Sequence, residues 1–330
     1  MIAVTGANGL LGSYIIRLLH ERKEPFVALK RKNSDISHLN DLKSHIRWCE
    51  ADVMDELSLK EAFQDVSGVI HTAAFVSFNP RNAEKVFAIN IEGTRNVINA
   101  ALASNAKRVL HVSSVAALGR QKGQTTVDET NKWIDSPINS NYAQSKYRAE
   151  LEVFRGQEEG LSTVIINPSV ILGYSNWEKS SSQLFKYAWE EKPFYMDGSF
   201  NYVDVRDVAA IALQLFHSKK IENERFILNA GSIGFKDFFD TLAQNFNKKG
   251  PSVRVGKPFL KPLAALESFR TRITGTEPII TRETARLAGT HFHYNAQKIQ
   301  KTLDYKFQTF DATAKWCCSR YAELYGGKNH

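Results

Sequence analysis

Short apolar runs alternate with longer amphipathic stretches over the first 173 residues of the chain. The short runs have the length of buried strands, and they cover residues 2–5, 26–29, 46–50, 69–71, 109–112 and 163–167. The longer stretches repeat apolar residues at helical spacing, and they cover residues 10–20, 56–63, 83–103 and 142–158. Strands that alternate with helices pair in parallel through crossover connections. The sequence therefore predicts an α/β fold with a doubly wound parallel sheet.

The alternation stops after Gly173, which indicates a second, smaller lobe. A chain of 330 residues is longer than one compact core usually contains. A strand and helix pattern returns at 203–230, and the remainder is mainly helical, with a last helix over 312–324. We expect a larger domain formed by residues 1–173 and 203–230, and a mostly helical, discontinuous substrate-binding lobe formed by residues 174–202 and 231–330.

Three glycines, Gly6, Gly9 and Gly12, lie between the first strand and the first helix. A dinucleotide pyrophosphate requires a tight turn, backbone without Cβ where it comes close, and the free N–H groups of a helix N-terminus. These glycines can supply all three, so the larger domain is expected to be an NAD(P)-binding Rossmann domain. The residues expected to contact the cofactor here are Gly6, Asn8, Gly9, Leu10, Leu11 and Gly12.

The end of the second strand carries three cations, Lys30, Arg31 and Lys32. A site that selects NAD usually places an acid here, on the ribose hydroxyls. A run of cations attracts a ribose 2′-phosphate instead, so we expect Lys30 and Arg31 to contact the cofactor, with NADP(H) favoured over NAD(H). A solvated basic loop is the alternative interpretation.

Tyr142 and Lys146 lie four positions apart in a predicted helix and therefore share one face. Tyrosine normally titrates near pH 10, and a nearby cation lowers the pKa of its hydroxyl. The pair is thus expected to perform acid–base catalysis, with Lys146 also reaching the ribose hydroxyls of a bound cofactor.

The glycine spacing and the Tyr142/Lys146 pair resemble the short-chain dehydrogenase/reductase superfamily, in its extended branch, the NAD-dependent epimerase/dehydratase family. The resemblance implies that Ser114, after the fifth strand, is the third catalytic residue, with Ser113 as the alternative. It also implies that Asn90 helps to organise the active site. Further cofactor contacts implied by the resemblance are Asp52, Val53, Thr72, Ala73 and Ala74.

Several positions distinguish branches of this superfamily. Dehydratases carry an acidic pair after the catalytic hydroxyl residue, where this chain has Val115 and Ala116. Sugar-nucleotide members usually carry arginine at the positions of Asn167 and Asn201. The segments 167–173 and 202–208 instead resemble the dihydroflavonol and cinnamoyl-CoA reductase group. By this resemblance, the strand end that borders the nicotinamide consists of Asn167, Pro168, Ser169 and Val170.

The expected activity is NAD(P)H-dependent interconversion of a carbonyl and an alcohol on a small substrate. Aromatic and apolar residues at 75–78, 194–195 and 202 form either an apolar pocket wall or part of the core, and the first interpretation suggests an apolar or aromatic substrate. An NAD-dependent nucleotide-sugar epimerase is the first alternative. A nucleotide-sensing binding protein without chemistry is the second.

Composition narrows the remaining possibilities. The net charge of +8 is spread over both halves, which disfavours nucleic acid as a partner. Three cysteines are too few for a disulfide framework, and no secretory leader or long apolar span is evident, so a cytoplasmic protein without membrane partners is expected. His71 is expected to be packed in its strand, and His291 and His293 are not expected to bind metal. By analogy with relatives, the helices at 83–103 and 142–158 could form a homodimer.

Overall fold

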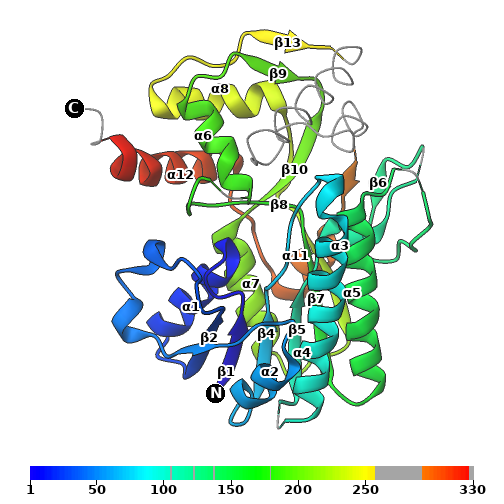
Figure 1. Ribbon diagram of the computed structural model, residues 1–330. Coiled ribbons are helices and arrows are strands. Elements are labelled where there is room, and N and C mark those ends of the chain that lie inside the picture. Colours follow the sequence, from blue (N-terminus) through cyan, green and yellow to red (C-terminus); the bar gives the residue numbers. More distant parts are fainter. Residues whose placement is uncertain (105, 122, 137, 179, 257–291, 327–330) are drawn as a thin grey trace.

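A computed structural model describes residues 1–104, 106–121, 123–136, 138–178, 180–256 and 292–326. Its centre is a sheet with the strand order β11-β7-β5-β4-β1-β2-β3, in which every neighbouring pair is parallel (Figure 1). The strands are β1 (Ile2–Thr5), β2 (Phe26–Lys30), β3 (Trp48–Glu50), β4 (Gly68–His71), β5 (Arg108–Val112), β7 (Ser162–Pro168) and β11 (Glu224–Leu228). The predicted doubly wound parallel sheet is confirmed.

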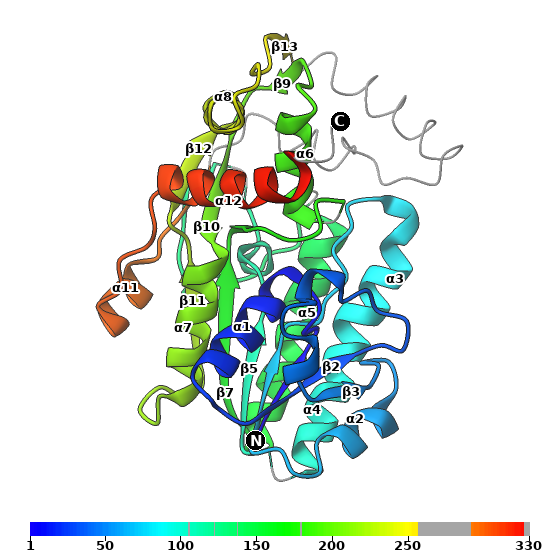
Figure 2. The same ribbon diagram turned by 90° about the vertical axis from the view of Figure 1, so that its left-hand side faces the viewer.

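Helices cover both faces of the sheet (Figures 1 and 2). One face packs against α1 (Leu10–Glu21) and α7 (Val205–His217), and the other packs against α2 (Glu56–Ala62), α4 (Gly93–Leu102) and α5 (Asn141–Glu158). Successive strand residues point to opposite faces, so Val4 joins the first of these cores and Ala3 the second. A sheet buried on both faces accounts for the nearly continuous apolar strands of the sequence.

The helix predicted over 83–103 is interrupted. It consists of α3 (Ala83–Phe87), a π-helical turn (Ala88–Glu92) and α4, and the turn contains Asn90. π turns inside α-helices are rare and often lie at functional sites.

The smaller part of the molecule lies beyond the carboxyl ends of the central strands (Figure 1). Its helices α6 (Gln183–Trp189), α8 (Phe235–Phe246) and α12 (Phe310–Tyr325) enclose an aromatic core that includes Phe185, Phe238 and Tyr321. Three short strands, β8 (Val170–Leu172), β10 (Ser199–Asp204) and β12 (Gly231–Gly234), form a second sheet beside this core.

The expectation of a mainly helical chain after Gly231 is only partly right. Besides α8, α12 and α11 (Gln297–Leu303), this region contributes β12, β13 (Val253–Val255) and β14 (His293–Tyr294). β13 pairs with β9 (Phe194–Met196), and β14 pairs with β6 (Thr126–Val127). Strands of two to four residues are too short to show an alternating pattern in a sequence.

The described helices include none that is both long and apolar enough to cross a membrane.

The exposed side of α4 and α5 carries ion pairs between Arg95 and Glu152 and between Arg155 and Glu152. A homodimer along these helices stays a prediction.

We expect the aromatic core of the smaller part to depend on Phe238, whose side chain is fully buried. Phe238→Ala should lower the free energy of unfolding by roughly 3–5 kcal/mol, because it removes buried surface and leaves a cavity. Phe194→Ala is the matched control, since Phe194 is 51% exposed. Urea unfolding followed by circular dichroism measures both, and equal losses in the two variants would contradict this packing.

Candidate functional site

The strand ends beneath the smaller part form the candidate site. β1 lies between β2 and β4, so the direction in which strands are added reverses at β1. Doubly wound sheets bind ligands at this reversal, outside the carboxyl ends of the strands. The predicted catalytic and cofactor residues lie at or just after the carboxyl ends of β1, β2, β3, β4, β5 and β7, or on the helices next to these ends.

The glycine turn after β1 is shaped for a close ligand. Gly6 has a φ of +65°, and a Cβ there would lie 2.7 Å from the Ala73 backbone nitrogen. A Cβ on Gly12 would lie 2.2 Å from the Gly6 carbonyl oxygen. Gly9 is the N-cap of α1 and supplies no side-chain cap, and the first turn of α1 has no acidic residue. The N–H groups of this helix end are therefore available to an anion, which fits a dinucleotide pyrophosphate.

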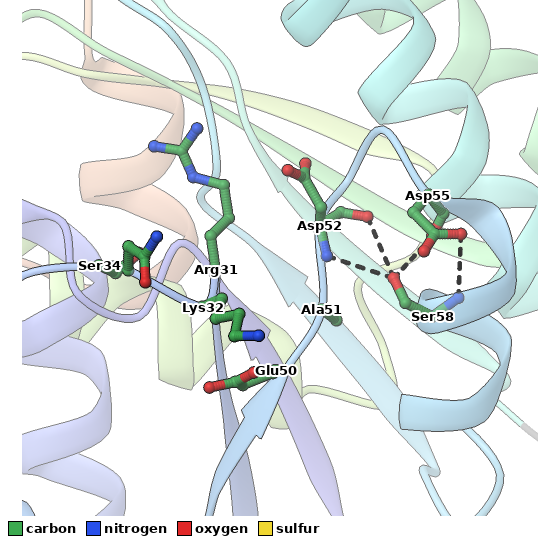
Figure 3. Close-up of a pocket in the computed structure, with 9 residues that line it drawn as sticks. Arg31, Lys32, Ser34, Glu50, Ala51, Asp52, Asp55 and Ser58 are labelled. Atoms are coloured by element: carbon green, nitrogen blue, oxygen red, sulfur yellow. Dashed lines mark hydrogen bonds between the residues drawn. The ribbon is translucent and has the colours of Figure 1, made fainter.

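An open pocket of about 470 Å³ lies at the ends of β2 and β3, and Arg31, Lys32 and Asp52 are among its lining residues. Figure 3 shows Arg31 and Asp52 pointing to the same side of this pocket. Lys30 is not among the lining residues, but its Nζ lies 3.6 Å from Oε1 of Glu50, which does line the pocket. Among the described residues, no carboxylate forms an ion pair with Arg31 or Lys32.

The segment after β4 packs directly on the glycine turn. Thr72 Oγ1 donates to the Thr5 carbonyl at 2.7 Å, and the Ala73 N–H donates to Thr5 Oγ1 at 3.4 Å. Asp52 and Val53 follow β3, and Val53 packs against Gly93 of α4. The structure thus brings the predicted cofactor residues of the first four strands to one edge.

Ser114 and Tyr142 meet at the end of β5. Their hydroxyl groups share a hydrogen bond, and Ser114 Oγ also accepts from the Ala116 N–H at 3.2 Å. Ser113, the alternative, is buried and does not hydrogen bond through its Oγ within the described part of the chain. The Phe78 ring packs edge-on against Tyr142, with centroids 5.7 Å apart.

Lys146 lies one helical turn below Tyr142 and is 2% exposed. Its Nζ donates to the Val112 carbonyl at 2.8 Å. Burial lowers the pKa of Lys146 to about 8, and the nearby Glu150 carboxylate opposes this effect.

The expectation that Lys146 lowers the pKa of Tyr142 is not met here. Burial raises the pKa of Tyr142 to about 12, and the hydrogen bond with Ser114 is the opposing influence. The lysine ammonium is directed at the Val112 carbonyl instead, which accounts for the difference. Tyr142 is consequently a protonated acid at neutral pH.

The Asn90 side chain is buried and forms hydrogen bonds with other groups of the protein. It is 1% exposed, accepts from the Phe75 N–H at 2.8 Å and donates to Ser145 Oγ at 2.9 Å. Asn90 therefore joins the segment after β4 to α5, the helix of Tyr142 and Lys146.

His71 is packed, as expected. Its Nδ1 lies 2.7 Å from Thr5 Oγ1 and its Nε2 lies 3.1 Å from Thr94 Oγ1. Burial, followed by the charge of Lys146, lowers the pKa of His71 to about 3. The neighbouring His111 is also buried, and burial lowers its pKa well below the usual value. Both rings are neutral at neutral pH.

Sequence reasoning did not identify one buried charged residue beside the site. Glu150 of α5 is fully buried, and its Oε1 accepts from Asn167 Nδ2 at 2.6 Å. Asn167, expected to contact the cofactor, is fully buried too and also donates to the Ser114 carbonyl at 2.9 Å. The spacing of Glu150 from Lys146, four residues along one helix face, was the available signal. Pro168, Ser169 and Val170 continue along the strand end.

In the smaller part of the molecule, the aromatic residues considered for the pocket wall differ in exposure. Tyr202 is 7% exposed and packs in the core against Phe310, whereas Phe194 is exposed. Cys317 and Cys318 are buried. Asn201 donates to the Phe292 carbonyl at 2.7 Å. His291, one of the two histidines that were not expected to bind metal, lies outside the described residues.

Comparison with known proteins agrees with this geometry. Residues 2–231 match the NAD dependent epimerase/dehydratase family. A putative dihydroflavonol 4-reductase of Synechocystis is 28% identical over 309 residues, covering 91% of this chain and 88% of the relative. Cinnamoyl-CoA reductase 1 of Petunia hybrida is 30% identical over 281 residues, covering 79% of this chain and 83% of the relative. The crystal structure of gox2253 superimposes with a TM-score of 0.80 at 30% identity, covering 99% of this chain and 98% of that one.

The chain therefore belongs to the NAD dependent epimerase/dehydratase family. The family and these relatives indicate an NAD(P)-dependent protein of the extended short-chain dehydrogenase/reductase type, a group of oxidoreductases and epimerases.

We expect Gly12→Ala to weaken NADPH binding by roughly tenfold or more, because the new Cβ displaces the Gly6 carbonyl and deforms the turn. The control is Gly234→Ala, at the N-cap of α8, where the nearest atoms belong to the Asp237 side chain 3.2 Å away. Calorimetric titration of nucleotide-free protein measures the affinity. Wild-type affinity in folded Gly12→Ala protein would refute the role of this turn.

Proposed function

We propose that this chain is an NADP(H)-preferring oxidoreductase that interconverts a carbonyl and an alcohol on a small apolar or aromatic substrate. The observation that carries the proposal is that Ser114 and Tyr142 meet at the end of β5, with buried Lys146 one helical turn below. The glycine turn lies along the same edge of the sheet.

Bound NADPH would supply the hydride that adds to the carbonyl carbon. Tyr142 donates its hydroxyl proton to the carbonyl oxygen as negative charge develops there. Ser114 donates a hydrogen bond to the same oxygen, so that two groups hold this charge. Lys146 contributes a positive charge beneath the site and reaches the ribose hydroxyls. The reverse oxidation uses the same groups.

The protonation state of Tyr142 suits reduction. A hydroxyl whose pKa is raised to about 12 by burial carries its proton at neutral pH and can donate it. Because Lys146 does not lower this pKa, we assign its positive charge to the cofactor side of the site, at the ribose hydroxyls.

The preference for NADP(H) rests on the pocket at β2 and β3. Arg31 and Lys32 line it, and Arg31 extends to the side that Asp52 also faces (Figure 3). Arginine binds phosphate through two parallel hydrogen bonds, whereas a ribose hydroxyl is better bound by a carboxylate.

The surroundings of Tyr142 support the proposed substrate class. Phe78 packs on its ring, and the neighbouring Val76 is 48% exposed at the same strand end. Asn201 occupies the position at which sugar-nucleotide relatives usually carry arginine, and its amide is bound to the Phe292 carbonyl. Asn201 therefore supplies no cation for a diphosphate. These features favour a carbonyl compound with an apolar or aromatic reacting end over a nucleotide sugar, in line with relatives named for dihydroflavonol and cinnamoyl-CoA reduction.

Tyr142→Phe should lower kcat at least about a hundredfold with NADPH affinity almost unchanged, because only the proton donor is removed. Lys146→Met should reduce both turnover and NADPH affinity. Stopped-flow oxidation of NADPH with an aromatic aldehyde measures kcat, and calorimetry measures the affinity. Wild-type turnover in Tyr142→Phe would refute the mechanism.

Nucleotide-free protein should bind NADPH more tightly than NADH in parallel calorimetric titrations. Arg31→Ala should weaken NADPH binding by about tenfold and leave NADH binding unchanged, since one charged hydrogen bond to phosphate is lost. Lys220→Ala provides the control, because this exposed lysine follows α7 at the opposite edge of the sheet. Tighter binding of NADH by the wild-type protein would overturn the cofactor preference.

A further inference from the structure

The carboxylate of Glu150 on α5 is fully buried and has no part in the mechanism above. Glu150 follows Tyr142 by eight residues and Lys146 by four, so all three share one face of α5. Burial of a charged carboxylate is unfavourable unless partners compensate for the lost hydration. The contacts of Glu150 therefore indicate what it contributes.

Two side chains from neighbouring strands compensate its charge. Asn167 Nδ2 of β7 donates to Glu150 Oε1 at 2.6 Å, and Arg225 Nη1 of β11 lies 3.2 Å from Glu150 Oε2. Arg225 also donates from Nη2 to the Glu129 carbonyl at 2.5 Å. The carboxylate is thereby held in one orientation between α5 and two strands.

The contact with Asn167 extends to the reacting groups. The Asn167 amide nitrogen also donates to the Ser114 carbonyl at 2.9 Å, while the Ser114 hydroxyl is hydrogen bonded to Tyr142. Tyr142 and Glu150 are part of the same helix, so these contacts form a closed loop of residues. These contacts therefore restrain the position of Ser114 relative to Tyr142.

The charge of Glu150 also acts on Lys146. His71 from β4 and His111 from β5 face Lys146, and both are neutral because burial lowers the pKa of each imidazole. Lys146 donates to a neutral carbonyl, that of Val112, and Tyr142 is protonated. Glu150 is the group that opposes the effect of burial by raising the pKa of Lys146.

We propose that Glu150 is a positioning residue with two effects on the proposed reaction: through Asn167 it holds Ser114 against Tyr142, and by its charge it keeps Lys146 protonated. This inference rests on the proposed function. A purely structural ion pair with Arg225 would contribute to folding alone and would leave the protonation of Lys146 unchanged.

The first test is Glu150→Gln, which keeps the size of the side chain and removes its charge. We expect the alkaline limb of the pH profile of kcat/KM to move to lower pH, because Lys146 loses its proton more readily. At pH 8, kcat/KM with NADPH and an aromatic aldehyde should fall by about tenfold, with a smaller fall at pH 6.

Glu152→Gln is the matched control on the same helix. Glu152 forms ion pairs with Arg95 and Arg155 and does not act on Lys146. Its pH profile should match that of the wild-type protein. An unshifted alkaline limb in Glu150→Gln, or an equal shift in both variants, would overturn the charge effect.

Asn167→Ala separates the two effects, because it removes the link to Ser114 and leaves the carboxylate. This variant should lose kcat by about tenfold while the alkaline limb stays at the wild-type pH. It also keeps the inference testable if Glu150→Gln does not fold. Wild-type kcat in Asn167→Ala would overturn the positioning effect.

A measurement without turnover separates this inference from the proposed function. The Cε signal of Lys146 in ¹³C-lysine-labelled protein, assigned with Lys146→Arg, can be titrated by NMR. Its midpoint should be lower in Glu150→Gln than in the wild-type protein and in Glu152→Gln. If the midpoint shifts but the wild-type protein reduces no carbonyl, the proposed function fails and the charge effect stands. An unshifted midpoint in an active reductase overturns the charge effect alone.

Discussion

The attachment of α5 across the ends of β5 and β7 is the contact on which the candidate site depends. Lys146 bonds to the Val112 carbonyl, and Glu150 bonds to Asn167. These contacts hold the helix on polar groups of the sheet rather than on apolar surface alone. Near its N-terminal end, α5 then presents Tyr142 to Ser114, so the separation of the two hydroxyl groups is set by contacts made deeper in the molecule.

The same attachment places buried polar groups where an apolar core would otherwise lie. Toward its C-terminal end, α5 packs against α4 and the sheet through Val153 and its neighbours. Toward its N-terminal end, the face against the sheet carries an ammonium and a carboxylate, each almost fully buried. Burying a charge has an unfavourable desolvation free energy even when the charge is paired. The polar groups in this half of the helix therefore lower the stability of the fold.

Much of the fold could be predicted because its signals are local. Apolar strands, amphipathic helices and the glycine turn each occupy a continuous segment, and the parallel sheet follows from their order. The contacts that organise the site join distant segments. Lys30 pairs with Glu50 because β2 and β3 place them side by side, and Asn167 reaches Glu150 because β7 packs on α5. The π turn at Asn90 left no recognisable pattern in the sequence.

The interlocked turn between β1 and α1 has a thermodynamic consequence. Gly6 and Gly12 are in mutual contact, and Ala73, which follows β4, packs against Gly6, so the protein's own packing sets the shape of the turn. Little conformational entropy is then lost when a nucleotide binds there. Affinity for the pyrophosphate is thus secured during folding rather than at the moment of binding.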